Sequence, residues 1–284
     1  MNPSTPYVAA FGAAGTLGML LLHLVFKRIV TPRHTVRGDL RGANTAWRLT
    51  QVGEVFAVFW IAASVVQNCL TGVLGHDLVW VSAFGALGVL LLEGVSLLGK
   101  RLLLRAKLRA ELDRDNAAAG LAAAASSVSA GILLGPALAG NDLRSVGLAM
   151  TFFTLAVFAQ AGFVSLFRAL TSYDDEEQIR GENFAAALSY AGLSIAVSVM
   201  VARGVEGDFE GWSQSLRGFG KVVAWTLGLY PVRQIVVQGL LLGARPSLRG
   251  GALDEAIGAD HNNAMAALEA AVYLGTATLI STLA

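Results

Sequence analysis

The segment Leu87-Gly88-Val89-Leu90-Leu91-Leu92-Glu93 carries one polar residue in an otherwise apolar run, five positions after the glycine of a Leu-Gly step. The same spacing recurs in three other apolar segments, at Leu17-Gly18 before His23, Thr154-Leu155 before Gln160 and Leu227-Gly228 before Arg233. An Asn then precedes a second apolar segment in each case: Asn44, Asn116, Asn183 and Asn262. A pattern that returns about every 70 residues is an internal repeat, so the chain is predicted to contain four repeat units.

The composition indicates a membrane protein. Hydrophobic residues make up 55% of the chain and charged residues 14%, whereas a soluble domain carries about 25% charged residues. A helix of about 20 apolar residues crosses the roughly 30 Å hydrocarbon core of a bilayer. Eight segments approach or reach that length, at about 7–26, 49–71, 78–99, 117–139, 146–167, 184–202, 219–243 and 262–283. We therefore expect an all-α polytopic membrane protein with eight transmembrane helices, and not a soluble bundle.

Each repeat unit holds two of these helices, so all four units should cross the membrane in the same direction. They group into two halves related by a pseudo-twofold axis. The first half is 1–140, with units at about 7–72 and 77–139, and the second is 141–284, with units at about 143–203 and 219–284. The second helix of most units is rich in Ala, Gly and Ser and should line the interior, because helix packing in lipid depends on close backbone approach.

The resemblance to a known family is carried by the segment that precedes each second helix. The third unit has the run Tyr173-Asp174-Asp175-Glu176-Glu177-Gln178-Ile179-Arg180-Gly181-Glu182-Asn183-Phe184-Ala185-Ala186-Ala187. The fourth has Leu253-Asp254-Glu255-Ala256-Ile257-Gly258 and Asn262-Asn263-Ala264-Met265-Ala266, with a short insertion between them, and the first two units match less well. The chain thus resembles the bacterial inner-membrane family catalogued as domain of unknown function 350 (YjfL-like), in four tandem degenerate copies. This resemblance implies a multi-spanning membrane protein and no particular chemistry.

The repeated Asn residues allow two interpretations. An Asn at a helix start accepts a hydrogen bond from a free backbone N–H group, and the acidic residues nearby favour the positive end of the helix dipole. On this interpretation Asn44, Asn116, Asn183 and Asn262 are helix caps. In the alternative, their side chains line a vestibule on the cytoplasmic side.

Seven polar residues fall inside the predicted membrane segments: His23, Glu54, Glu93, Gln160, Arg233, Gln234 and Gln238. An ionisable group at that depth costs about 2.5–3.5 kcal/mol or more, so it usually faces protein or water and marks a functional site. The repeat makes Glu93 the counterpart of Arg233, and His23 the counterpart of Gln160. We therefore consider a Glu93–Arg233 ion pair near the centre, against the alternative that each polar group is satisfied locally.

The sequence allows two kinds of function. Parallel repeats with polar groups at matched depth are typical of transporters, so a channel or transporter for a small solute or ion is the first hypothesis. A non-catalytic scaffold with an envelope or membrane-stress role, recruiting a cytosolic partner through the charged segment 100–115, is the second. We find no motif for an enzyme, a cofactor or a metal site. The expected partner is the lipid bilayer, with further copies of the chain and a cytosolic protein at segment 100–115 as candidates, but not nucleic acid.

The distribution of charge predicts the topology. Sixteen Lys and Arg residues lie around the ends of the odd-numbered helices, and four lie on the opposite side. The side richer in Lys and Arg faces the cytoplasm in inner-membrane proteins, so both termini should be extracytoplasmic. Alkaline phosphatase fused to the C-terminus should therefore be active in bacterial cells. An inactive phosphatase with an active cytosolic reporter at the same position would reverse the topology.

Overall fold

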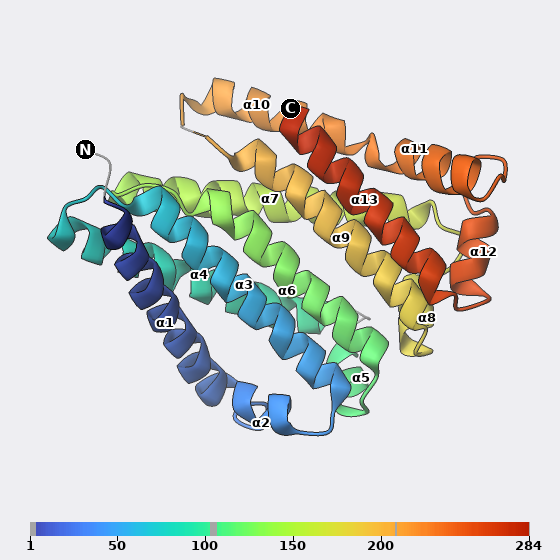
Figure 1. Ribbon diagram of the computed structural model, residues 1–284, viewed down its shortest axis with the longest axis horizontal. Helices are drawn as coiled ribbons and strands as arrows, with labels where there is room; N and C mark the ends of the chain where they lie inside the picture. Colours follow the sequence, from blue (N-terminus) through green and yellow to red (C-terminus); the bar gives the residue numbers. More distant parts are fainter. Residues whose placement is uncertain (1–3, 103–106, 208, 284) are drawn as a thin grey trace.

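The computed structural model describes residues 4–102, 107–207 and 209–283, and every regular element in these ranges is a helix (Figure 1). The long helices are α1 (Thr5–Val30), α3 (Thr45–Cys69), α4 (Leu74–Leu102), α6 (Ala117–Ala137), α7 (Leu143–Ala169), α9 (Phe184–Val205) and α13 (Asn263–Leu283). Short helices precede the second helix of each unit: α2 (Val36–Arg41), α5 (Leu108–Asp113), α8 (Asp175–Arg180) and α12 (Ala252–Gly258). The chain is thus an all-α series of four helical hairpins, and the two termini lie at the end opposite the short helices.

Seven helices in the described ranges, and not the expected eight, are long and apolar enough to cross a membrane. The segment expected at 219–243 is divided into α10 (Trp212–Thr226), α11 (Leu229–Arg233) and a π-helix, η2 (Gln234–Leu241). Pro231 contributes to the interruption because it has no N–H group to donate to the carbonyl of Leu227, one turn earlier. Helix interruptions and π-helical turns of this kind are frequent at functional sites.

The second helices form a row in the order α3, α6, α9 and α13, in which each helix packs along the next. Small residues let the backbones approach closely: Gly120 lies against Ala46, Gly131 against Ala57 and Gly192 against Ala270. The expectation that these helices line the interior holds best for α6 and α9, whose membrane segments are each 72% buried, against 17% for α1. Helix α13 ends the row and is 28% buried.

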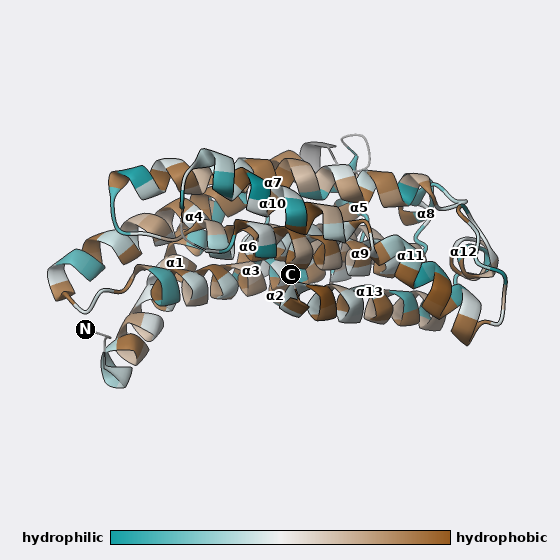
Figure 2. Cartoon of the chain, turned by 90° about the horizontal axis from the view of Figure 1, so that it is seen from above, coloured by the Kyte–Doolittle hydropathy of each residue, from teal (hydrophilic) through white to brown (hydrophobic). Residues whose placement is uncertain are grey.

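The first helices lie against this row. Helix α4 contacts both α3 and α6, and α7 contacts both α6 and α9, so each covers the joint between two second helices. Figure 2 shows α4 and α7 on the same side of the row, with apolar residues over most of their length. On α3, the bulky residues Phe56 and Phe59 are 47–50% exposed. They therefore extend the apolar exterior that a membrane protein presents to lipid.

The close approach of α6 to α3 makes a glycine substitution there costly. A Cβ atom on Gly120 would lie 2.5 Å from the Cα atom of Ala46 and 2.6 Å from its carbonyl oxygen, both backbone atoms. Gly120→Ala should therefore destabilise the protein by about 1–3 kcal/mol, the usual cost of overpacking. Gly18→Ala on α1 is the control, because a Cβ there meets nothing within 4 Å. Thermal unfolding in detergent micelles, followed by circular dichroism, measures the difference, and equal midpoints for the two variants would contradict the close packing.

Candidate functional site

The first buried cluster, which we call the His23 cluster, consists of His23, Lys27, Glu54, Glu93 and Ser96. Its members come from α1, α3 and α4, and their side chains are buried. His23 Nδ1 lies 2.5 Å from Glu93 Oε1. Lys27 Nζ lies 2.6 Å from Glu54 Oε2 and 3.8 Å from Glu93 Oε2, and the hydroxyl of Ser96 donates to Glu54 Oε1 at 2.9 Å. The cluster therefore joins three membrane helices through a continuous set of ionisable groups.

Sequence analysis identified His23, Glu54 and Glu93 but missed Lys27. A lysine one turn from the end of a membrane helix commonly extends its amine to the interface, and Lys27 was one of the sixteen basic residues counted around the ends of the odd-numbered helices. In the structure it is 3% exposed. The available signal was its position four residues after His23, which places both side chains on the same face of α1.

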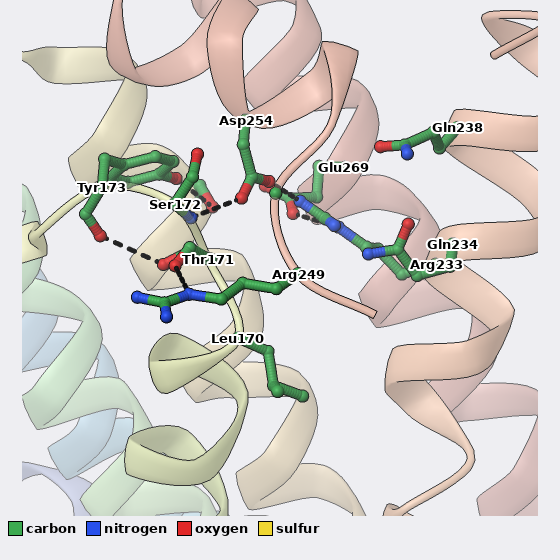
Figure 3. Close-up of polar contacts among 12 residues, drawn as sticks. Leu170, Thr171, Ser172, Tyr173, Arg233, Gln234, Gln238, Arg249, Asp254 and Glu269 are labelled. Atoms are coloured by element: carbon green, nitrogen blue, oxygen red, sulfur yellow. Dashed lines mark hydrogen bonds and ion pairs between the residues drawn. The ribbon is translucent and has the colours of Figure 1, made fainter. Parts of the chain in front are cut away.

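The second cluster, which we call the Arg233 cluster, is centred on a fully buried arginine at the end of α11 (Figure 3). Arg233 Nη2 donates to Asp254 Oδ1 at 2.5 Å, and Nε donates to Glu269 Oε1 at 2.7 Å. The other carboxylate oxygen of Asp254 accepts from the backbone N–H of Ser172 at 2.8 Å. The arginine on α11 thus connects, through these two carboxylates, α12, α13 and the loop after α7. Sequence analysis gave Asp254 only as part of the acidic segment before the second helix of the fourth unit and did not select Glu269, although Glu269 is the only charged residue of α13.

The glutamines near Arg233 bond within their own part of the chain. Gln234 Nε2 donates to the hydroxyl of Tyr230 at 2.9 Å, and Gln238 Nε2 donates to the carbonyl oxygen of Arg245 at 2.8 Å. Gln234 and Gln238 are both buried. Gln160, by contrast, lies partly exposed on α7. The amide N–H groups of Gln234 and Gln238 are therefore satisfied locally, whereas among the described residues neither buried Oε1 atom has a hydrogen-bond partner.

The hypothesis of a Glu93–Arg233 ion pair is wrong. Glu93 pairs with His23 and Lys27 of the first repeat unit, whereas Arg233 pairs with Asp254 and Glu269 of its own unit. The reason lies in the arrangement of the units, which stand side by side in a row instead of facing one another across a central axis. Glu93 and Arg233 therefore occupy equivalent positions in their repeat units but do not meet.

A further ion pair, which is partly buried, lies between the two clusters along the row. Arg168, near the end of α7, pairs with Asp175 at the start of α8, and its Nη1 donates to Ser189 Oγ at 3.0 Å. Its guanidinium also lies over the ring of Tyr173, 5.1 Å from the centroid. Burial raises the pKa of Asp175 above its ordinary value, although the neighbouring Arg168 acts in the opposite direction.

All four repeated Asn residues cap the following helix. Their Oδ1 atoms accept from the backbone N–H groups of Trp47, Ala119, Ala186 and Met265, at 2.8–3.2 Å. Three of them also link their unit to the next one through the side-chain amide, at 2.7–2.8 Å: Asn44 to the carbonyl of Leu112, Asn116 to that of Ile179 and Asn183 to that of Ile257. Asn262 belongs to the last unit and is exposed. This geometry supports the capping interpretation and gives the motif a second role in joining units.

A cavity of about 1360 Å³ opens at the other end of the helices, near the termini. It lies between α3 and α6 of the first half and α7, α9 and α10 of the second. Polar and aromatic residues line it together, among them Ser64, Gln67, Asn68, Phe152, Arg203, Gln214 and Trp225. Such a mixed lining suits a small polar or amphipathic molecule.

Two sequence hypotheses concern other parts of the chain. The segment 100–115, suggested as a docking surface, includes residues 103–106, which lie outside the described residues. Its last part is involved in contacts within the protein, since Arg114 pairs with Glu111 at 2.6 Å and with Glu182 at 2.8 Å. Over the described part of the chain, His, Cys, Asp and Glu side chains form no group of three suited to a metal ion.

Comparison with known proteins gives one family. The family model described as Domain of Unknown Function (DUF350) matches residues 2–138 and, a second time, residues 142–283. The match therefore comes in two copies, each holding two helical hairpins, whereas the sequence suggested four copies of one hairpin each. No curated protein and no solved structure matches the chain.

The hydrogen bonds that the Asn side-chain amides donate to the next unit can be tested with a matched pair of variants. Asn116→Ala removes the cap of α6 and also the two hydrogen bonds that its side-chain amide donates, to the carbonyl of Ile179 and to Glu111 Oε2, whereas Asn262→Ala removes only a cap. Loss of a cap costs about 1 kcal/mol, and each further hydrogen bond that is lost costs about 0.5–1.5 kcal/mol more. Thermal unfolding in micelles should therefore show a clearly larger loss for Asn116→Ala. Equal losses would show that the bond between units contributes nothing beyond the cap.

Proposed function

We propose that this chain, which belongs to the DUF350 family and carries its domain twice in tandem, is a membrane channel or transporter for a small polar solute or ion. The observation that carries the proposal is the cavity of about 1360 Å³ where the two family copies meet. Transporters built from repeats commonly bind their substrates at the interface between the repeats. The cavity has that position and a lining that combines hydrogen-bonding groups with aromatic rings.

The chemistry of the cavity limits the class of solute. Its charged groups include both signs, and Arg203 Nη1 pairs with Glu206 Oε2 at 2.6 Å. Amide and hydroxyl groups supply further donors and acceptors. This lining favours an uncharged or zwitterionic molecule with some apolar surface. An ion would instead require a cavity lined by charges of one sign, which give an electrostatic potential of one sign.

The buried clusters support the same proposal. Ionisable groups inside membrane segments are costly and usually mark ion pathways, proton relays or coupling sites. This chain holds the His23 and Arg233 clusters near the end of the helices opposite the cavity. With the basic loops in the cytoplasm, as the charge distribution predicts, the cavity would face the outside of a bacterial inner membrane. The scaffold hypothesis depends on segment 100–115 and stays a prediction.

Flux into liposomes tests the proposal. Proteoliposomes containing the full chain should take up radiolabelled glycine, used as a zwitterionic probe, or glycerol, used as an uncharged one, faster than empty liposomes. Ser64→Trp places a large side chain in the cavity and should reduce uptake to the level of empty liposomes. Val52→Trp is the control, because Val52 lies on the same helix, is 58% exposed and does not line the cavity.

Two results would contradict the proposal. The first is uptake of both probes, and of potassium ions, that equals uptake into empty liposomes. The second is equal inhibition by Ser64→Trp and Val52→Trp when both variants elute as single folded species in size-exclusion chromatography. A cytosolic protein that co-purifies with the chain and depends on segment 100–115, together with absent flux, would favour the scaffold instead.

A further inference from the structure

We infer that a second molecule of this chain continues the row of second helices, with α13 of one molecule packed against α3 of the next. Within one molecule the row runs α3, α6, α9 and α13, so it ends at α3 on one side and at α13 on the other (Figure 1). The four helices run in the same direction. A neighbour with the same orientation therefore presents its α3 to this α13, and the contact repeats from molecule to molecule because it uses a different surface on each.

Neighbouring helices of the row meet at fixed positions of the repeat, counted from the repeated Asn. Position 9 of one second helix lies against position 8 of the next. A Cβ atom on Gly53 would lie 2.6 Å from the Cα atom of Ala124, and one on Gly192 would lie 2.6 Å from that of Ala270. Two further contacts between α3 and α6 join position 2 to position 4 and position 13 to position 15: Ala46 with Gly120 and Ala57 with Gly131.

At the two ends of the row, the same positions are exposed. On α13, positions 2, 9 and 13 are small residues: Ala264, Ala271 and Gly275. On α3, positions 4, 8 and 15 are larger ones: Arg48, Val52 and Phe59. A Cβ atom on Gly275 would meet nothing within 4 Å, so the small residues of α13 leave room for the larger side chains of α3. The two exposed faces are thus complementary and continue an interface that already exists inside the chain.

Helix α1 has an open side where the helix of a preceding unit would lie. In the second unit, α4 covers the joint between α3 and α6, and a Cβ atom on Gly88 would lie 2.7 Å from Cγ2 of Ile61 in the preceding unit. Gly18 has the same position on α1, and a Cβ atom there would meet nothing within 4 Å. The counterpart of Ile61 in the last unit is Leu279, which is 62% exposed. Leu279 of one molecule therefore packs on Gly18 of the next.

The hydrogen bonds between units point to the same junction. Each of the first three repeated Asn residues donates its amide to a carbonyl of the following unit, whereas the exposed amide of Asn262 has no acceptor among the described residues. Two of the acceptors, Leu112 and Ile179, lie four residues before the next Asn, as Leu40 does in the first unit. Leu40 is 44% exposed, whereas Leu112 and Ile179 are buried. Asn262 of one molecule and the carbonyl of Leu40 in the next thus form the corresponding pair.

The charges at the two ends of the row are also complementary. The segment 36–44, which leads into α3, has Arg37 and Arg41 exposed, while its only acidic residue, Asp39, accepts from Gln51. The equivalent segment 252–262, which leads into α13, contains no Lys or Arg and has Glu255 and Asp260 exposed. Opposite charges favour the contact of α13 with α3 and disfavour the contact of two like ends.

Disulfide formation between molecules tests the contact. Cys69→Ala removes the only cysteine of the chain, and Ala271→Cys and Val52→Cys are then introduced into two separate full-length chains with different tags. The two chains are co-expressed in bacterial membranes and oxidised with iodine, which enters the bilayer. The mixture should give a disulfide dimer that carries both tags, because position 9 of α13 meets position 8 of α3. Either chain expressed alone should give none.

A matched control shows that the dimer depends on the position and not on exposure. Leu90→Cys replaces Val52→Cys in the mixture, since Leu90 is 50% exposed on α4 and Val52 is 58% exposed on α3. This mixture should stay monomeric after oxidation.

Native mass spectrometry in a mild detergent is the second measurement. The wild type should appear as multiples of one chain. Gly275→Trp fills the space for Phe59 and should leave the single chain as the main species. Gly162→Trp is its control, because Gly162 is exposed on α7 and a Cβ atom there also meets nothing within 4 Å.

Three results would overturn the inference. The first is a disulfide dimer formed by Ala271→Cys alone, which would show that α13 meets α13. The second is the absence of the mixed dimer when both chains are present in the membrane. If a cysteine variant does not reach the membrane, the masses decide, and a wild type found only as a single chain, or equal masses for the two Trp variants, is the third.

This contact does not depend on the transport proposed above. The cavity lies within one chain, so a molecule that has lost its neighbour keeps the solute pathway. Val52→Trp, the control for solute uptake, lies at the contact and outside the cavity, and should therefore weaken association while uptake continues. Absent uptake together with the mixed dimer would reject transport alone, whereas uptake without the mixed dimer would reject the contact alone.

Discussion

Lipid provides no hydrophobic force that drives apolar helices together, so this fold depends on direct contact between backbones at glycine and alanine. The row of α3, α6, α9 and α13 is built from such contacts, for example between Gly120 and Ala46 and between Gly192 and Ala270. At one end of the row the Asn amides bind carbonyl oxygens of the following unit. Close packing along the helices and hydrogen bonds at their ends therefore join the same pairs of neighbouring units.

The row also determines which charges can meet. Units that stand side by side exchange contacts only with their neighbours, so each buried charge must find its partner there. The His23 cluster forms among α1, α3 and α4, and the Arg233 cluster forms among α11, α12 and α13. The two family copies thus hold ionisable groups at equivalent positions in the repeat, but with different chemistry. A cavity with a mixed polar and aromatic lining remains where the copies meet.

Much of this could be predicted because it depends on order along the chain. Hydropathy and the repeated spacing indicated a polytopic all-α protein, and the position of each Asn before an apolar segment indicated a helix cap. The partners of the buried charges could not be predicted in the same way. Lys27 was counted with the basic residues at a helix end, and Asp254 was taken only as part of the acidic segment before a helix. Both side chains are buried by elements distant in sequence.

The repeat in the sequence determined by itself that the chain consists of hairpins with matched helices, since periodicity and hydropathy are properties of local order. Only the tertiary structure decided that the hairpins form a row, that the segment around Pro231 is divided into shorter helices, and that Glu93 pairs with His23 instead of Arg233. The physical reason is that a repeat specifies the position of a residue along its helix. It leaves the lateral neighbours of that helix open, and these are chosen by packing between small residues far apart in the chain.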